Sequence, residues 1–285
     1  MSTIEEIVKS YNPKNLIETK LVLRELVQQI VLIGLSRSGF FNYASFYGGT
    51  ALRIFYNLSR YSEDLDFTLN KVDTNFSLDP YISKITDIAK SYGLDLIVST
   101  KVKQIDTPIE SAFAKLNTYQ AFIDLNLNNK LISTIHKDEV IKVKFEIDTN
   151  PSVGFNIESK WLDIPEFANI NVLNLESLFA GKIHAILCRN YKNHVKGRDY
   201  YDYLFYIRKR VKPNMGYLRN KLIDSNKLNE SDLFNMEILK NMLIKRFNEV
   251  DFKQVSDDAR KFIINGEDLS YYSKELFIQM TDKLE

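Results

Sequence analysis

The stretch FYGGTALRIFYNLSRYSEDLDFTL, residues 46–69, decides the fold of this chain. It contains a double glycine, Gly48–Gly49, and further along two aspartates, Asp64 and Asp66, one residue apart within an apolar run. Globular proteins rarely place these two features so close together. Their proximity suggests a shared role.

The pattern on either side of the glycines predicts the local structure. Residues 44–47 fit a short strand that the glycines stop, and Thr50 can begin a helix as its cap or as a first-turn residue. The segment TALRIFYNL, residues 50–58, continues that helix. The sequence thus predicts a strand, a glycine turn and a helix in succession.

The segment DLDFTL, residues 64–69, alternates polar and apolar side chains. Successive side chains of a strand point to opposite faces, so Asp64, Asp66 and Thr68 share one face and the apolar residues share the other. This segment is predicted to be a second strand that carries both acids on one side.

The composition is that of a globular protein. Of 285 residues, 45% are hydrophobic and 12% aromatic, which suits one large domain or two small ones and argues against disorder. The single cysteine, Cys188, allows no internal disulfide and fits a reducing cytoplasm. No secretion signal and no membrane-spanning run is expected. A formal net charge of +1 excludes strong attraction to nucleic acid over the whole surface but allows a local basic patch.

Along the rest of the chain the pattern changes from mixed to helical. Helices are predicted over 14–37 and 79–94, the second capped by Asp79, and strands over 94–102 and 139–149. Residues 112–123 fit neither pattern.

From Leu175 onward nearly every segment has helical periodicity. The change predicts an α+β protein with two domains. We place the boundary within 165–172, which gives a first domain over 1–168, including an N-terminal helix, and a helical domain over 169–285.

Two carboxylates on one strand face can bind a hard divalent cation such as Mg²⁺. A third acid on a neighbouring strand would complete a two-metal site for phosphoryl-group chemistry. Glu146 is the first candidate and Asp148, on the same face, is the alternative. The glycines would let a triphosphate approach the backbone, and the helix after them would offer free N–H groups. Alone, an Asp-x-Asp pair is more often a solvated strand edge, and a double glycine more often a simple turn; their combination favours a metal and phosphate site.

The helical half supplies a candidate lysine. On the helix predicted around LESLFAGKIHAILCR, residues 175–189, Lys182 lies on the apolar face. It either extends to solvent along a packed stem or contacts a phosphate. His184 and Cys188 lie on the opposite side and are assigned no chemistry.

The segment that follows adds acids and bases. Asp199 begins the next helix and Asp202 stands three residues later, each either a cap or dipole partner of the helix or part of a site. Residues 189–212 contain eight Lys or Arg against two Asp. The eight are Arg189, Lys192, Lys196, Arg198, Arg208, Lys209, Arg210 and Lys212. Contact with a polyanion or solvated helix ends would both account for this excess.

Four motifs resemble, in order, those of the AbiEii/AbiGii nucleotidyltransferase family, toxins of abortive-infection and toxin-antitoxin systems. They are GGTALRIFYNLSRYSEDLDF (48–67), KVKFEIDTNP (142–151), LFAGKIHAILCR (178–189) and KGRDYYDYLFYI (196–207). The resemblance implies a polymerase-beta-like nucleotidyltransferase core with a mixed sheet, followed by a helical domain. It also implies Mg²⁺-dependent use of a nucleoside triphosphate, an RNA acceptor (tRNA in particular), an antitoxin encoded nearby and a part in phage defence.

The family motifs assign roles to single residues. Gly48, Gly49 and Thr50 match the triphosphate-binding turn, and Asp64 and Asp66 match the metal pair. Further matches are Glu146 as the third acid, Lys182 as the lysine motif and Asp199 as the last acidic motif. The wider superfamily usually has Gly-Ser at the turn, so the hydroxyl of Thr50 is shifted by one residue. Arg60 also fits the family pattern, either as a packing residue or as a charge partner of Asp64.

These roles lead to one expected mechanism and two rivals. Asp64 and Asp66 would hold Mg²⁺, while Glu146 would be the third ligand or would orient and activate the acceptor hydroxyl. Lys182 would stabilise charge on the triphosphate, and Asp199 would fix Lys182 or a base edge. The rivals are a small-molecule nucleotidyltransferase of the antibiotic-modifying type and a catalytically silent nucleotide-binding module.

Overall fold

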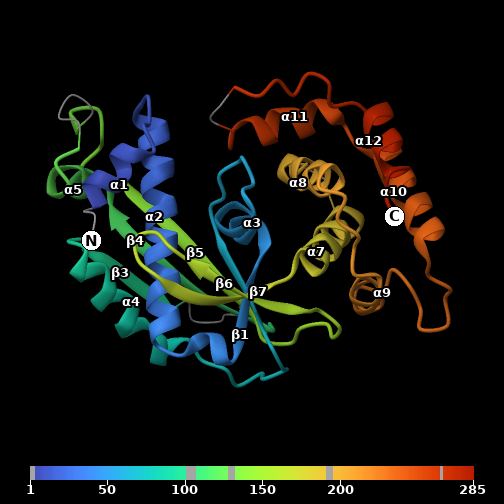
Figure 1. Ribbon diagram of the computed structural model, residues 1–285, viewed down its shortest axis with the longest axis horizontal. Helices are drawn as coiled ribbons and strands as arrows, with labels where there is room; N and C mark the ends of the chain where they lie inside the picture. The colour runs from blue at the N-terminus through green and yellow to red at the C-terminus, as the bar shows by residue number, and fades with distance from the viewer. Residues whose placement is uncertain (1–3, 101–106, 128–131, 191–194, 264–265) are drawn as a thin grey trace. The chain divides into compact units, whose positions relative to one another are not determined.

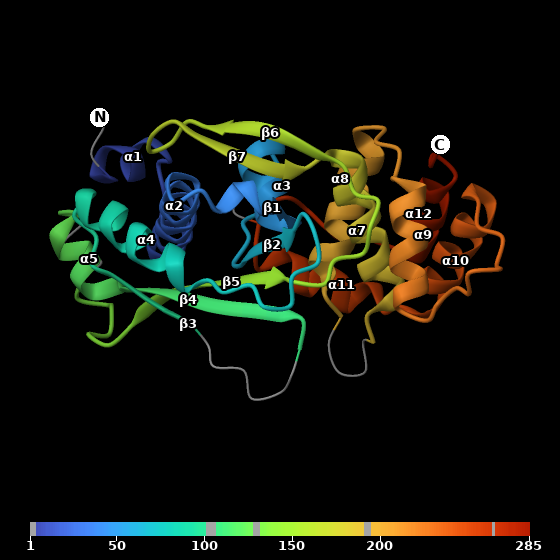
Figure 2. The same cartoon turned by 90° about the horizontal axis from the view of Figure 1, so that it is seen from below.

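The computed structural model describes residues 4–100, 107–127, 132–190, 195–263 and 266–285 (Figure 1, Figure 2). The chain divides into two compact units. The sheet unit consists of Met1–Tyr56, Tyr61–Pro151 and Ser159–Val172. The helical unit consists of Asn57–Arg60, Ser152–Glu158 and Leu173–Glu285.

A mixed sheet forms the framework of the sheet unit. Within the described residues it has seven strands in the order β3-β4-β5-β2-β1-β7-β6. β2 runs parallel to β5 and antiparallel to β1, and β1 runs parallel to β7. The strands are β1 Ala44–Tyr47, β2 Leu65–Leu69, β3 Leu96–Thr100, β4 Ile109–Asn117, β5 Val140–Asp148, β6 Ile157–Leu162 and β7 Ala168–Leu173.

One long helix, α2 (Leu16–Arg37), supports this sheet. It packs against β5 and against helix α4 (Asp79–Ser91) (Figure 2), and its apolar side chains are buried over most of its length. Gly34 allows the close approach to α4, since a Cβ at that position would stand 2.6 Å from the Cα of Ile85. The other elements are α1 Ile4–Ser10, η1 Phe40–Asn42, α3 Gly48–Tyr56, α4 Asp79–Ser91 and α5 Thr118–Asp124.

The structure confirms the predicted strand, glycine turn and helix and corrects several boundaries. Helix α3 begins at Gly48 rather than at Thr50. The prediction that Asp79 caps α4 is wrong, because Leu78 is at the cap position and Asp79 lies in the first turn. Of the strand predicted over 94–102, residues 96–100 form β3, and residues 101 and 102 lie outside the described residues.

The elements β4, α5, β6 and β7 were not predicted from the pattern. Residues 112–123, which fitted neither period, contain the end of β4 and most of α5. Strands β6 and β7 lie where the sequence shifts toward the helical half. Asn117 is both the last residue of β4 and the cap of α5. Neither the strand period nor the helix period therefore extends through the whole segment.

The helical unit is built around α8. Its helices are α7 Leu175–Cys188, α8 Gly197–Arg208, α9 Met215–Asp224, α10 Met236–Glu249, α11 Phe252–Arg260 and α12 Lys274–Thr281. Helix α8 contacts α7, α11 and α12 (Figure 1). Its aromatic side chains Tyr200 and Tyr203 are buried and contact the rings of Phe247 and Phe277. An aromatic core of this kind fixes the position of α8.

The first residue of α8 sits directly against α11. A Cβ at Gly197 would overlap the carbonyl oxygen of Val255, so only glycine fits. The Gly197 N–H donates a hydrogen bond to Asp258 Oδ2 at 2.8 Å, which satisfies an amide that has no partner inside the helix.

The two units together make an α+β protein, as the sequence predicts. Within the described part of the chain, none of the helices has the length and apolar character that a membrane crossing requires.

Candidate active site

Asp66 and Glu146 are neighbours in the sheet. β2 and β5 pair in parallel with Asp66 opposite Glu146 and Thr68 opposite Asp148. Residues opposite each other in a parallel pair project to the same face, so the two carboxylates lie on one side of the sheet. Both are half-buried. The non-local pairing of β2 with β5 therefore places a third acid beside the aspartate pair.

The glycine turn touches Asp66. β1 pairs with β2 so that Tyr47 is opposite Asp66, and the chain then turns into α3 at Gly48. Gly48 has φ +85°, a conformation that L side chains rarely adopt. A Cβ there would collide with Asp66 Oδ2 and stand 3.2 Å from the Asp66 Cβ. Glycine is required for both reasons, and the Asp66 carboxylate lies against the beginning of α3.

This arrangement places an acid next to a helix N-terminus. The first-turn amides of a helix have no partner within the helix, and the helix dipole favours an anion there. Gly48 and Gly49 supply the first two of these amides without side chains that would block a large ligand. A triphosphate at this end could reach the amides and share a cation with Asp66.

Thr50 has a different contact from the expected one. Its side chain is fully buried, and its hydroxyl donates a short hydrogen bond to the backbone carbonyl of Asp64. The hydroxyl is therefore directed at the protein, and it fixes the residue before β2. This geometry makes Thr50 a support for Asp64 and gives its side chain no position from which to contact phosphate.

Glu146, the first candidate for the third acid, forms an ion pair with a lysine. Glu146 Oε1 is 2.5 Å from Lys144 Nζ and accepts a longer hydrogen bond of 3.4 Å from Ser111 Oγ. Asp148 Oδ1 accepts from the backbone N–H of Asn150 at 3.0 Å. Across the described residues, no three Asp, Glu, His or Cys side chains form a group that could hold a metal ion. Glu146 would have to leave Lys144 to join Asp64 and Asp66 around one cation.

The donor set nevertheless fits Mg²⁺ in its chemistry. Mg²⁺ prefers oxygen ligands and is commonly held by one or two carboxylates together with substrate phosphates. Asp66 supplies such a carboxylate beside the beginning of α3, and Asp64, the residue just before β2, is the candidate for the second. A pair of acids with a triphosphate is a sufficient ligand set, and Glu146 would be an additional ligand or act on the acceptor.

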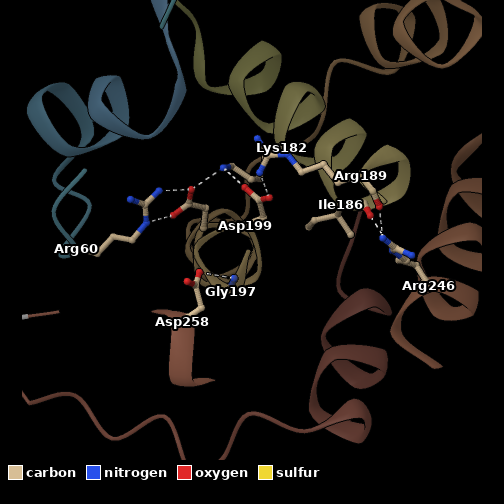
Figure 3. A network of polar contacts seen from close by, with 9 residues as sticks. Arg60, Lys182, Ile186, Arg189, Gly197, Asp199, Arg246 and Asp258 are labelled. Carbon is tan, nitrogen blue, oxygen red and sulfur yellow. Dashed lines mark hydrogen bonds and ion pairs between the residues drawn. The ribbon is translucent and has the colours of Figure 1, made fainter. Parts of the chain in front are cut away.

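A second polar cluster lies in the helical unit (Figure 3). Lys182 Nζ on α7 is 2.7 Å from Asp199 Oδ1 and 2.8 Å from Asp202 Oδ2, both on α8. The Lys182 side chain is only 13% exposed. The sequence alternative in which Lys182 extends freely to solvent does not describe this geometry, because the ammonium group is held by two carboxylates.

Asp199 holds two cations at once. Besides Lys182, its second oxygen accepts a short hydrogen bond from Arg189 (Figure 3). Burial acts to raise the pKa of the Asp199 carboxyl, but the nearby charges of Lys182 and Arg189 outweigh it and hold the pKa below its ordinary value. Asp199 therefore stays ionised. The prediction that it begins and caps α8 is wrong, because α8 begins at Gly197 with Lys196 at the cap position, and Asp199 is a partner of Lys182 in the first turn.

Asp202 and Arg60 were not identified as a pair from the sequence. Arg60 Nε and Nη2 donate to the two oxygens of Asp202 at 2.7 and 2.6 Å. Both side chains are almost completely enclosed, at 2% and 0% exposure. The sequence nevertheless contained a signal for a role of Asp202 in the cluster. Asp202 stands three residues after Asp199 within an aromatic run, and residues three apart share a helix face.

His184 and Cys188, to which the sequence assigned no chemistry, make no hydrogen bond or ion pair with Lys182, Asp199 or Asp202 among the described residues. Each is half-buried, and a nitrogen of the His184 ring is 2.7 Å from Ser225 Oγ. Burial, with the nearby charge of Lys221, lowers the pKa of His184 to about 4. At neutral pH the ring is therefore uncharged.

Several bases of the 189–212 segment have partners within the chain. Arg198 stacks on the Phe262 ring at 4.0 Å, and Arg208 lies 3.7 Å from Glu267. Lys196, Lys209 and Arg210 are exposed, and Lys192 lies outside the described residues. The charge of Arg208 is thus partly compensated by Glu267, whereas the stacked Arg198 keeps its charge.

Comparison with known proteins gives the family. The model of the family described as nucleotidyl transferase AbiEii toxin, type IV toxin-antitoxin system, matches residues 30–271. No curated protein matches the chain. Among solved structures, JHP933 from Helicobacter pylori has 16% identity and a TM-score of 0.54, with 92% of this chain and 90% of that chain covered.

A second solved structure comes from another bacterium. MenT4, a nucleotidyltransferase toxin from Mycobacterium tuberculosis, has 13% identity and a TM-score of 0.52, with 98% of this chain and 88% of that chain covered. Both likenesses are at the level of the fold. Because the family model matches most of its length, this chain belongs to the AbiEii nucleotidyltransferase toxin family.

Proposed function

We propose that this protein is a Mg²⁺-dependent toxin that transfers a nucleotide from a nucleoside triphosphate to an RNA acceptor, with tRNA as the favoured class. The observation that carries the chemistry is the contact of the Asp66 carboxylate with the Gly48 turn, beside Glu146 in the paired strand. Phosphate and cation sites adjoin each other in such a geometry. The family supplies the reaction type.

The sheet unit would bind the triphosphate. Its phosphates would lie at the first amides of α3, where Gly48 and Gly49 leave the backbone accessible. Thr50 would act indirectly by holding the Asp64 carbonyl, as its buried hydroxyl does in the structure. Binding at fixed amides orients the α-phosphate for in-line attack by an acceptor hydroxyl.

The acids would hold the cation and act on the acceptor. Asp64 and Asp66 are the proposed ligands of Mg²⁺, which when bound neutralises phosphate charge and lowers the barrier to attack. Glu146 would complete the ligand set or accept the proton of the attacking hydroxyl, and Asp148 is the alternative third acid. Lys144, which now holds Glu146, would have to release it in the active state.

Lys182 and Asp199 are assigned to the same reaction by the family motifs. In this proposal Lys182 stabilises negative charge on the triphosphate, and Asp199 orients the ammonium group, as their 2.7 Å contact supports. An ammonium held by two carboxylates keeps a fixed position, which favours charge stabilisation without reorganisation.

The acceptor is inferred from family membership and from the exposed bases Lys196, Lys209 and Arg210. A small-molecule acceptor is the second candidate. It is favoured by the internal partners of Arg198 and Arg208, which reduce the basic surface available to RNA. The family description also implies an antitoxin, which we expect to be encoded beside this gene. In this proposal the toxin and its antitoxin act in the bacterial cytoplasm during phage defence.

The deciding experiment supplies the purified chain with each of the four labelled ribonucleoside triphosphates, Mg²⁺ and total RNA. A labelled RNA band that disappears with a chelator, and with the Asp66→Asn variant, is the expected result. A fall in the rate as salt is raised would support RNA binding through the basic segment. Label on a small molecule would favour the second candidate, and no transfer to any acceptor would refute the enzymatic proposal.

A further inference from the structure

We propose that Asp202 is a positioning residue for Lys182 and that Arg60 fixes Asp202 in turn. This inference rests on the proposed function, because it concerns the lysine assigned to the triphosphate. Neither Asp202 nor Arg60 has a role in the proposed mechanism above, yet both touch the cluster that holds Lys182.

The first observation is the geometry of Asp202. Arg60 donates to both of its oxygens, at 2.7 and 2.6 Å, and Lys182 Nζ stands 2.8 Å from the second oxygen. The planar guanidinium fork fixes the plane of a carboxylate far better than a single donor does. The oxygen that faces Lys182 is therefore held in a fixed position.

The second observation is that Lys182 requires more than one fixed partner. A lysine has a flexible stem with several rotatable bonds, so one carboxylate leaves its ammonium free to pivot. Asp199 supplies one contact at 2.7 Å, and Asp202 supplies the other from the next turn of α8. Two anchors on one rigid helix face define where the ammonium lies.

The third observation is the balance of charge. The cluster contains three cations, Arg60, Lys182 and Arg189, and two carboxylates, Asp199 and Asp202. Asp202 stands between two of the cations. Without its charge, Arg60 would be left buried beside Lys182, and like charges in an enclosed site repel strongly. Lys182 would then move away from Arg60.

Enclosure separates this role from a catalytic one. Asp202 has no exposed side-chain surface, and Arg60 has 2%. Neither can touch a substrate in this arrangement, so each can act on the reaction only through Lys182. Asp199 is almost as enclosed, at 3%, and differs from Asp202 in that its second oxygen holds the exposed Arg189.

A double-mutant cycle on the full-length protein tests the inference. kcat/KM for pyrophosphate release is measured for the wild type, Asp202→Asn, Lys182→Ala and the double variant. Asp202→Asn should lower kcat/KM by about 10-fold to 100-fold in the wild type. In the Lys182→Ala background it should change by less than about threefold. Equal fold losses in both backgrounds, or full activity of Asp202→Asn, would overturn the inference.

A second measurement does not depend on activity. A brief pulse of acetic anhydride, followed by mass spectrometry, reports how accessible the Lys182 amine is relative to the exposed Lys209. Labelling of Lys182 should rise in Asp202→Asn, and to a smaller extent in Arg60→Lys, which keeps the charge but loses the fork. Wild-type labelling in both variants would contradict positioning, even if the protein transfers no nucleotide at all.

Asp258→Asn is the matched control. Asp258 is another buried acid of the helical unit, and it accepts the N–H of Gly197 at the start of α8. Its loss should lower thermal stability while leaving Lys182 labelling and kcat/KM at the wild-type level. If Asp202→Asn does not fold, Arg60→Lys takes its place in the cycle with the same expected non-additivity.

Discussion

Asp66 stands directly opposite Glu146 across parallel strands β2 and β5, and its carboxylate also lies against Gly48 at the beginning of α3. One side chain therefore adjoins both a second acid and a helix N-terminus. Because helix amides bind phosphate and paired acids bind Mg²⁺, this residue is where the two halves of a nucleotide site would join.

Asp64→Asn and Asp66→Asn should each reduce nucleotide transfer by at least about 100-fold, because an amide supplies no charge to hold Mg²⁺. The thermal unfolding midpoint should stay close to that of the wild type, since the substitutions keep the side-chain shape. Transfer is measured with labelled triphosphate. Asp95→Asn, an exposed acid of the same unit, serves as the control. Undiminished transfer by the double variant would refute the assignment of the acid pair.

Lys144→Met should lower the Mg²⁺ concentration at half-maximal activity by about twofold to fivefold, the range expected for one partly exposed ion pair. The reason is that Lys144 competes for Glu146 at 2.5 Å. A Mg²⁺ titration of the initial rate measures the change. Lys142→Met is the matched control, because Lys142 lies over the Phe113 ring at 3.8 Å instead of on an acid.

The same assay distinguishes the two candidates for the third carboxylate of the site, Glu146 and Asp148. If Glu146 joins the cation or the acceptor, Glu146→Gln should lose activity and Asp148→Asn should keep it. The reverse pattern would make Asp148 the third acid. A Lys144→Met variant that needs more Mg²⁺ than the wild type would contradict a role for Glu146 at the cation.

Gly48→Ala should abolish transfer at a modest cost in stability. The added methyl group must displace the Asp66 carboxylate, and the positive φ costs about 1–2 kcal/mol for an L residue. Gly93→Ala is the matched control, because Gly93 has φ +73° but nothing within 4 Å of the added Cβ. It should lose similar stability in a denaturant titration and keep full activity. Equal activity of the two variants would show that the Gly48 contact has no functional weight.

His184 should make the protein less stable in mild acid. Its pKa is lowered to about 4 in the folded chain, from 6.5, so the unfolded chain binds the extra proton between those values. The free energy of unfolding therefore falls as pH drops from about 6.5 toward about 4. His184→Gln should flatten the pH dependence of the unfolding midpoint in that window. A slope that His184→Gln does not alter would contradict the prediction.

Much of the fold can be predicted from local patterns. β1, β2 and β5, the long helix α2 and the helices of the second half follow from side-chain periodicity, which the backbone geometry of each element imposes locally. β6 and β7 were missed, because their pairing with the rest of the sheet depends on distant partners. At Asn117 a strand gives way to a helix with no linker, so neither period extends far enough to be recognised.

The sequence by itself predicted that a glycine turn begins the helix before the acids and that Asp64 and Asp66 share a strand face, whereas the structure has Asp66 in β2 and Asp64 immediately before it. It also determined that Lys182 lies on the buried side of its helix, and its motifs pointed to the family. These properties depend only on neighbouring residues and on the repeat of a helix or strand.

Only the tertiary structure decided which groups meet. The register of β2 with β5 placed Glu146 beside Asp66, and the fold of the helical unit brought Arg60 to Asp202, far along the chain. Burial then determined that Arg60 and Asp202 pair, because an enclosed charge is stable only where an opposite charge is held against it. No local pattern contains that information, since it arises from pairing between segments distant in sequence.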